Sequence, residues 1–407
     1  MRDEQNSQDR DELPAPVTGT GGFHHVKKDG TPVRRTQKLL GPGGHFWRLK
    51  HWLSERLTKK QIIIGGTAFV LIFGGAVAFA LSNHAAAPKS PPVVVVKQTP
   101  KPVITSPLTG LPVSAADAKR PVTGVMIENS DFARPQSGLG QAGVVFEAIA
   151  EAGITRFLAL FQEAQPNNIG PVRSVRPYFL QWDMGFDAPL AHVGGSPTAL
   201  NDMKVWNAKD LNEFYYGSYF HRISSREAPH NMYTSMANLN AIERLRHWTA
   251  STFTGFQRKK DEPSKSPTAT SINFNISSPD YYIHYAYDAK NNAYLRWEGG
   301  AVHTDANTHK QLEPKVVIGL VVPFSLGPLD STGAYYSDYT TIGSGAAYVF
   351  QDGTLTIGKW SKASRTSPLE FLTTSGSPLK LNAGQTWITA LGSTSYITYH
   401  GPAKPKQ

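Results

Sequence analysis

Two apolar runs of strand length are each followed by a helical pattern that begins with proline. The first run is Phe157 to Phe161, and after a polar loop Pro177 opens a helical pattern. The second run is Ala188 to Val193, and it leads into Ser196, a suitable helix N-cap, and Pro197, a suitable first helical residue. Two strand-to-helix turns in succession predict alternating β and α elements, a partly parallel sheet, and both helix starts at one edge.

Neighbouring patterns extend this region into a mixed α/β domain over residues 106–250. Val122 to Glu128 predicts a strand, and Ala142 to Glu151 carries helix and strand signals together. Asn212 to Asn231 is a polar, aromatic loop, and Met236 to Trp248 has the spacing of a helix that closes the domain.

The C-terminal part of the chain changes to short apolar or alternating runs separated by Gly, Asn, Asp and Ser. A charged stretch at 251–271 is expected to be a linker, and residues 272–400 are expected to form a mostly antiparallel β domain. Asp352-Gly353 between two alternating runs is typical of a type I′ hairpin turn. The predicted strands are Phe274 to Tyr287, Tyr294 to Trp297, Val316 to Val322, Ala346 to Phe350, Leu355 to Trp360 and Thr386 to Leu391.

The longest apolar stretch lies near the N-terminus. Ile62 to Leu81 contains no charged residue and is long enough to span a hydrocarbon core of about 30 Å. A cleaved signal peptide is the alternative, but the 60-residue leader and the length of the apolar run favour a retained anchor. Basic residues crowd the N-terminal side, which predicts a cytoplasmic tail and extracytoplasmic folded domains. The predicted order is a disordered basic cytoplasmic tail (1–60), a transmembrane helix (61–81) and an extended linker (82–105).

The overall fold class is therefore α+β, with an N-terminal mixed α/β domain and a C-terminal β domain behind a single transmembrane helix. The 407 residues include 41 basic and 31 acidic side chains, giving a net charge of +10 that favours acidic partners. The aromatic and basic residues at 45–60 lie beside the predicted span, so we interpret them as contacts with anionic lipid rather than nucleic acid. The absence of cysteine excludes disulfides, thiol catalysis, zinc–thiolate sites and a lipid-anchor cysteine.

Several motifs together resemble the YerB-like family of bacterial envelope proteins, whose two modules have no settled activity. The resemblance covers nearly all of residues 107–395 and implies an extracytoplasmic, membrane-attached protein. Related proteins are typically lipoproteins, whereas the anchor expected here is a transmembrane helix behind a long tail. The motifs are PLTGLPV (107–113), MIEN (126–129), ARPQSGL (133–139), EAGITRF (151–157), IGPVRSVRPYF (169–179), AHVGGSP (191–197), GAAYVFQDG (345–353), KWSKASR (359–365) and NAGQTWI (382–388).

A weaker architectural likeness is to glycopolymer phosphotransferases, which pair arginines with metal-holding aspartates. The corresponding loops here read ITRF and PVRSVRP and lack those acids. The likeness therefore supports no particular chemistry.

Arginines near the two helix starts are the leading candidates for a ligand site. Arg173 and Arg176, with Arg134 and Arg156 as neighbours, can bind phosphate or carboxylate in bidentate fashion beside unpaired helix N–H groups. The alternative is that they pair with Glu128, Glu147, Glu151 or Asp183 and only hold the loops together.

Five further polar residues complete the candidate set. His192 precedes the Gly-Gly turn and is either an acid or base or, more commonly, a hydrogen-bonded core histidine. Ser196 lacks a nucleophile context and is explained by helix capping. Arg222, His230 and Asn231 lie on a long loop, the usual setting for ligand contact. No metal or cofactor motif is present, so no metal and no cofactor are expected.

Two functions follow from these patterns. The favoured one is a membrane-anchored binding or scaffold module that recognises an anionic, phosphate-bearing cell-wall or lipid-linked ligand through an arginine-lined cleft. Envelope protein partners are compatible with it, and nucleic acid is disfavoured. The alternative is an envelope enzyme of phosphotransferase or hydrolase type acting on a phosphorylated glycan or lipid precursor. No activated nucleophile or metal set can be assembled from the motifs, and this favours binding.

Overall fold

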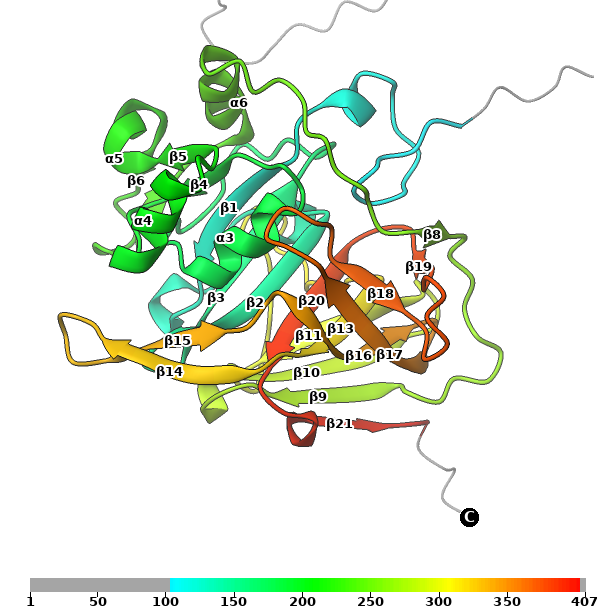
Figure 1. Cartoon of the computed structure of the whole chain (residues 1–407). Helices are drawn as coiled ribbons and strands as arrows, with labels where there is room; N and C mark the ends of the chain where they lie inside the picture. The colour runs from blue at the N-terminus through cyan, green and yellow to red at the C-terminus, as the bar shows by residue number, and fades with distance from the viewer. Residues whose placement is uncertain (1–102, 403–407) are drawn as a thin grey trace, which may run out of the picture. The chain divides into compact units, whose positions relative to one another are not determined.

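A computed structural model describes residues 103–402 of the chain (Figure 1). The predicted tail (1–60), the predicted span (61–81) and most of the predicted linker (82–105) lie outside the described residues. Within residues 103–402, no helix combines the length and apolarity needed to cross a bilayer.

One 12-stranded mixed sheet receives strands from both halves of the sequence. Its main order is β18-β17-β16-β13-β20-β2-β3-β1-β4-β5, with the β14–β15 hairpin attached to β2. At its centre β2 and β20 pair in parallel, Val145 opposite Trp387, so the two predicted domains share a hydrogen-bonded ladder. The strands are β1 (Thr123–Glu128), β2 (Val144–Glu151), β3 (Ile154–Phe161), β4 (Leu190–His192), β5 (Asp210–Asn212), β13 (Val316–Val321), β14 (Phe324–Leu329), β15 (Tyr335–Tyr339), β16 (Gly343–Gln351), β17 (Thr354–Lys362), β18 (Glu370–Leu372) and β20 (Thr386–Leu391).

A second, five-stranded antiparallel sheet comes wholly from the C-terminal half (Figure 1). Its residues Phe274 and Tyr285 pack with Val317 and Phe350 of the large sheet in one core. Its strands are β9 (Ser271–Asn275), β10 (Tyr282–Asp288), β11 (Ala293–Glu298), β12 (Ala301–Val302) and β21 (Ile397–His400). Two strand pairs complete the structure, β6 (His221–Arg222) with β7 (Met232–Tyr233) and β8 (Arg258–Lys259) with β19 (Leu381–Asn382).

The helices cover the two faces of the large sheet, and strand alternation explains which residues each face buries. Along β1, Met126 joins the core that contains α3 residues, while Val125 and Ile127 join the core that contains α6 residues. The α-helices are α3 (Pro177–Met184), α4 (Pro197–Val205), α5 (Glu213–Tyr216) and α6 (Met236–Leu245). Pro177 and Pro197 occupy the first helical positions, as predicted.

Aromatic side chains fill the core between α3 and the central strands. Phe146 of β2 stacks on Trp182 of α3 with ring centroids 5.1 Å apart and meets Phe186 edge-on at 6.2 Å. All three are buried, and each such side chain contributes about 1.5–3 kcal/mol of hydrophobic stabilisation. The ambiguous segment Ala142 to Glu151 is therefore a strand because its position at the sheet centre buries both of its faces.

Most C-terminal strand predictions are confirmed, but the run from Phe274 to Tyr287 is not one strand, because the turn with the 3-10 helix Pro279–Tyr281 divides it into β9 and β10. At the β16–β17 turn, Asp352 (φ 57°) and Gly353 (φ 72°) both adopt left-handed backbone, as a type I′ turn requires. The β14–β15 hairpin was not predicted, because its mostly exposed residues give no burial pattern to detect.

Two segments expected to be loops contain structure. The stretch Asn212–Asn231 includes α5 and β6. In the expected linker, β8 pairs with β19, and the Arg258 guanidinium donates to Asn382 O and Thr386 Oγ1, both at 2.9 Å. Burial lowers the pKa of Arg258 to about 10. The segment therefore fastens the two halves of the sequence together.

Candidate functional site

The starts of α3 and α4 lie at one edge of the sheet, as the sequence predicted, but the strand that runs parallel to β4 at this edge is β1 and not β3, the strand expected to lead into α3. β1 and β4 are parallel neighbours, and Val175 before α3 bridges Gly195 before α4. On its other side β1 pairs antiparallel with β3. In open α/β sheets, ligands bind outside the carboxyl ends of strands, so this edge is the natural place to look.

Arg156 and Arg176 are held by one carboxylate. Each donates to a different oxygen of Glu151 at 2.5 Å, and each also donates to a backbone carbonyl at 2.8 Å. Both guanidinium groups are buried. Burial by itself raises the pKa of Glu151, but Arg156 and Arg176 together hold it below its usual range. These two arginines therefore pair internally and fix the loops between β2, β3 and α3.

Arg173 stands in a different environment from its neighbours. Its Nε lies 3.4 Å from Glu128 Oε2, beyond good hydrogen-bond geometry, and is buried without a partner among the described residues. The side chain is 24% exposed. Burial lowers the pKa of Arg173, with Glu128 opposing and Arg156 adding to the effect. A guanidinium in this state retains donors for an incoming anion.

Glu128, at the end of β1, gathers the polar groups around Arg173. His230 Nδ1 lies 2.7 Å from Glu128 Oε1, and the Ser130 hydroxyl donates to the same oxygen at 2.9 Å. Ser130 Oγ is also 3.3 Å from His230 Nδ1. The same imidazole nitrogen thus meets serine and carboxylate, whereas a nucleophile relay needs two different nitrogens. Glu128 therefore holds Ser130 and His230 in place, but the contacts do not activate the Ser130 hydroxyl as a nucleophile.

Arg222 and Asn231 lie on the β6–β7 hairpin beside this cluster. Arg222 Nη1 donates to Asn231 Oδ1 at 2.7 Å, and Asn231 Nδ2 donates to two backbone carbonyls of the same hairpin. The charge of Arg222 contributes to the lowered pKa of Arg173. We define the Arg173 cluster as Glu128, Ser130, Arg173, Arg222 and His230.

His192 is a core residue. It is fully buried, with Nδ1 2.7 Å from Gly194 O and Nε2 3.0 Å from Asp210 Oδ1. Both ring nitrogens are engaged, so the side chain does not face the arginines as an acid or base.

Ser196 caps α4. Its hydroxyl accepts from Ala199 N at 3.3 Å, the contact expected of an N-cap. Replacing Ser196 with alanine is expected to lower the free energy of unfolding by about 1 kcal/mol. Urea unfolding of the two proteins measures this loss, and Ser196→Asp should restore most of it. A change confined to ligand binding, with unaltered stability, would contradict the capping role.

Arg134 is separated from the Arg173 cluster and reaches the second sheet. Its guanidinium donates to Asn129 O at 3.1 Å and Asp280 O at 3.0 Å, pairs with Asp131 at 3.0 Å, and lies over the Tyr281 ring. It lines a pocket of about 360 Å³ at the rim of β11 and β12. The four predicted arginines therefore do not form one cleft.

A buried charge network between the halves of the sequence was missed by the sequence analysis. Arg296 of β11 donates to both oxygens of Glu147 at 3.1 and 3.0 Å, to Tyr285 at 2.7 Å and to His303 Nδ1 at 2.9 Å. Burial raises the pKa of Glu147 to about 7 against the opposing effect of Arg296, and burial lowers the pKa of His303 well below its usual value. Glu147 therefore pairs with this distant arginine and not with the arginines near the helix starts.

Within residues 103–402, no three His, Asp or Glu side chains are grouped so as to hold a metal ion. Asp183, another acid suggested as an arginine partner, is buried, and its Oδ1 has no hydrogen-bond partner in the described part of the chain. Burial raises its pKa well above the usual value.

Comparison with known proteins places this architecture in a family. Residues 108–249 match the family described as "Protein of unknown function (DUF3048) N-terminal domain", and residues 272–388 match its C-terminal domain. The chain is 32% identical over 290 residues to the "Putative lipoprotein YerB" of Bacillus subtilis (strain 168), covering 70% of this chain and 85% of the relative. A crystal structure of the YerB protein from Bacillus subtilis superposes with a TM-score of 0.64 at 28% identity, covering 72% of this chain and 99% of that chain. The chain therefore belongs to the two-module YerB-like family, whose domains are described as being of unknown function.

Proposed function

We propose that this protein is a membrane-attached cell-envelope module that binds a phosphate-bearing ligand through the Arg173 cluster. The name of the Bacillus subtilis relative, a lipoprotein, and the apolar segment Ile62 to Leu81 both support attachment to a membrane. The positive-inside pattern supports placing the folded part on the extracytoplasmic side.

Arg173 differs from its neighbours in the hydrogen-bond donors that it leaves unused, and the proposal rests on this difference. Arg156 and Arg176 each donate from both terminal nitrogens, to Glu151 and to a backbone carbonyl, and leave only Nε without a partner. Arg173 forms no side-chain hydrogen bond with any residue in 103–402 and pairs with Glu128 only at 3.4 Å. Arg222 supplies a second positive charge nearby, and His230 and Ser130 supply adjustable donors. An anion with three oxygens matches the planar, multi-donor guanidinium better than a neutral ligand does.

Binding is favoured over catalysis because of the contacts of Ser130. Its hydroxyl donates to Glu128 and lacks a separate base, and the described residues offer no metal-binding group. The alternative function, an envelope phosphotransferase or hydrolase, would use Arg173 for charge stabilisation and His230 as acid or base.

Calorimetric titration of the purified full chain with glycerol 3-phosphate tests the proposal. Replacing Arg173 with alanine is expected to weaken binding about 10- to 100-fold, because a charged hydrogen bond contributes about 1.5–3 kcal/mol. Arg173→Lys should recover only part of the affinity, since an ammonium cannot make the bidentate contact.

The matched control is Arg365→Ala, which removes an exposed arginine that lies over the Trp206 ring, outside the Arg173 cluster. It should bind glycerol 3-phosphate like the wild type. Equal affinity of wild type and Arg173→Ala, with both proteins folded, would disprove the role of Arg173. Turnover of a phosphate ester by the wild type that His230→Ala abolishes would favour the enzyme instead.

A further inference from the structure

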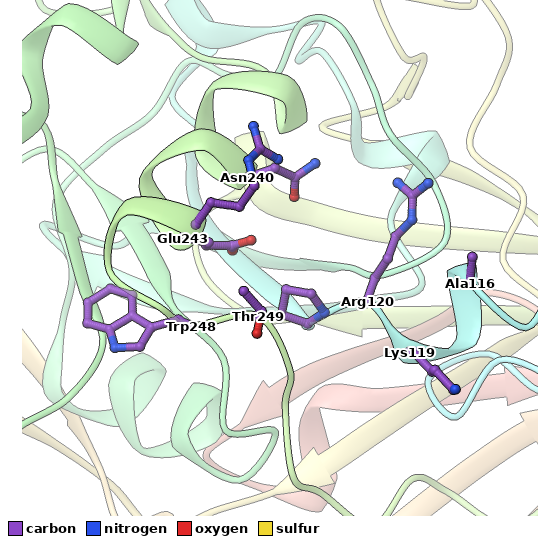
Figure 2. Close-up of a pocket in the computed structure, with 9 residues that line it drawn as sticks. Ala116, Lys119, Arg120, Asn240, Glu243, Trp248 and Thr249 are labelled. Atoms are coloured by element: carbon purple, nitrogen blue, oxygen red, sulfur yellow. The ribbon is translucent and has the colours of Figure 1, made fainter.

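Two neighbouring pockets share one tryptophan on the side of the molecule where α6 ends. One has a volume of about 440 Å³ and is lined by Lys119, Arg120, Glu243, Arg244 and Trp248 among others (Figure 2). The other has a volume of about 690 Å³ and is lined by Asn207, Tyr215, Tyr216, Arg246 and again Trp248. Both volumes fall within the range of small-molecule sites. We call the two pockets together the Trp248 groove.

Helix ends fix the walls of the Trp248 groove. At the end of α6, His247 adopts left-handed backbone (φ 58°), Trp248 N donates to Glu243 O and His247 N donates to Arg244 O. At the end of α4, Asn207 adopts the same conformation, and Ala208 N donates to Met203 O. These are Schellman endings, which hold the residues that follow the helix in one geometry. The backbone at Trp248 is thus fixed before a ligand arrives, which limits the entropy lost on binding.

The rim of the groove carries positive charge that the protein leaves free. Arg120 and Lys209 are already paired, with Asp117 at 2.9 Å and Asp187 at 2.7 Å. Lys119, Arg244 and Arg246 are exposed, and none forms an ion pair with another residue in 103–402. Arg246 instead lies over the Trp248 ring at 5.0 Å. An acidic ligand is the complement of such a rim.

A buried carboxylate faces the first pocket between these cations. Glu243 is 2% exposed; its Oε1 accepts from the Thr123 hydroxyl at 2.6 Å, and its Oε2 has no hydrogen-bond partner in the described chain. Figure 2 shows Glu243 and Asn240 reaching from α6, with Trp248 on one side and Lys119 and Arg120 on the other. Burial raises the pKa of Glu243 to about 7, so its carboxyl group both accepts and donates hydrogen bonds near neutral pH. An unpartnered buried oxygen is costly unless a ligand hydroxyl satisfies it.

We propose that the Trp248 groove binds an acidic saccharide of at least two sugar units. One sugar lies against Trp248 and donates a hydroxyl hydrogen to Glu243, while its acidic groups meet Lys119, Arg244 and Arg246. The second pocket receives the next unit beside Tyr215 and Tyr216, which present aromatic surface and a polar tip together.

This groove is distinct from the Arg173 cluster. Thr123, which contacts Glu243, is the first residue of β1, whereas Glu128 of the Arg173 cluster is its last. A saccharide fits better than a nucleic acid because its hydroxyl groups can donate to the unpartnered Glu243 Oε2, whereas the phosphate groups of a nucleic-acid backbone offer only acceptors. An acidic saccharide fits better than a neutral glycan because Lys119, Arg244 and Arg246, which form no ion pair within residues 103–402, line the rim.

Calorimetric titration of the full chain with tetragalacturonate tests the proposal, with neutral cellotetraose and an eight-residue thymidine oligonucleotide as comparison ligands. We expect tetragalacturonate to bind at least 10-fold more tightly than either. Arg244→Ala and Trp248→Ala should each weaken binding by at least 10-fold, and Glu243→Gln by a smaller factor, since an amide still accepts one hydrogen bond.

Lys290→Ala, which removes an exposed cation between β10 and β11, is the matched control and should bind tetragalacturonate like the wild type. If Trp248→Ala fails to fold, Arg244→Ala decides, because its exposed side chain leaves the core intact. Wild-type affinity in Arg244→Ala, loss of binding in Lys290→Ala, or tighter binding of cellotetraose or the oligonucleotide would each overturn the proposal. The two proposals are tested separately. If glycerol 3-phosphate does not bind through Arg173 but tetragalacturonate binds as expected, the saccharide site in the Trp248 groove is still supported.

Discussion

Replacing Arg296 with methionine is expected to lower the free energy of unfolding by about 3–5 kcal/mol, because it leaves buried acids without their counter-charge. Arg296 and Glu147 are both wholly buried, and their side chains meet at 3.0 Å. The Arg296 guanidinium also lies 4.5 Å from the centre of the Trp387 ring and 3.6 Å from Glu298. Methionine approximates the volume of the aliphatic part of arginine, so the loss of unfolding free energy reflects mainly the missing guanidinium charge. Urea unfolding of the full chain, followed by tryptophan fluorescence, measures it.

The control for this change is Arg365→Met, which alters an exposed arginine over Trp206 and should cost less than about 1 kcal/mol. Combining Arg296→Met with Glu147→Gln should recover part of the loss, since the double variant no longer buries an unpaired Glu147 carboxylate. A loss below about 1 kcal/mol in Arg296→Met, or no recovery in the double variant, would show that the network does not hold the sheets together.

Glu151→Ala is expected to produce a similarly large loss, again about 3–5 kcal/mol, because two buried arginines share this carboxylate. The side chains of Arg156 and Arg176 are 3% and 6% exposed. Removing Glu151 leaves both charges in a poorly solvated site between β2, β3 and α3. Urea unfolding measures the loss, and Glu151→Gln should be milder because the amide oxygen still accepts from one arginine.

Glu262→Ala provides the comparison, since Glu262 also pairs with a basic residue, Lys260, but on the surface. We expect no measurable change in stability there. By contrast, Arg173→Ala should reduce anion binding and cost less stability than Glu151→Ala, because Arg173 is 24% exposed and pairs with Glu128 only at 3.4 Å. If Arg173→Ala destabilises the protein as strongly as Glu151→Ala does, Arg173 is structural and the proposed anion site is lost.

The sequence predicted those parts of the fold that depend on the preferences of neighbouring residues or on a local apolar pattern. Proline at the first helical position, serine as the N-cap of α4 and the Asp352-Gly353 turn are set by backbone preferences of one or two residues. Strands that bury one or both faces, such as β3 and β13, also gave clear apolar runs.

Long-range pairing could not be predicted in the same way. Glu147 and Arg296 are 149 positions apart, and nothing near either residue identifies the other. The same limit applies to the candidate site. Sequence spacing grouped Arg156, Arg173 and Arg176, but only the three-dimensional positions of Glu151 and Glu128 separate the two arginines paired at 2.5 Å from Arg173, which is paired only at 3.4 Å. Ser130 was missed because a lone serine after a strand carries no motif.

The Trp248 groove escaped sequence analysis for a related reason. Its walls come from residues 116–121, the end of α4 and the end of α6, which no short motif connects. A signal was nevertheless present in the sequence, since two basic residues and one aromatic residue stand at every second position, Arg244, Arg246 and Trp248. That run was assigned only to a closing helix.

The parallel pairing of β2 with β20 has a consequence for how the chain matures. During synthesis, Val144 to Glu147 emerge long before their partners Thr386 to Thr389, so one edge of β2 stays open until the last part of the chain arrives. Such distant partners make folding slow, and an open apolar strand edge invites wrong pairing between nascent chains. A protein truncated after residue 250 would keep that edge permanently exposed. The N-terminal module is therefore expected to aggregate when produced alone, and β20 protects the complete protein by covering that edge.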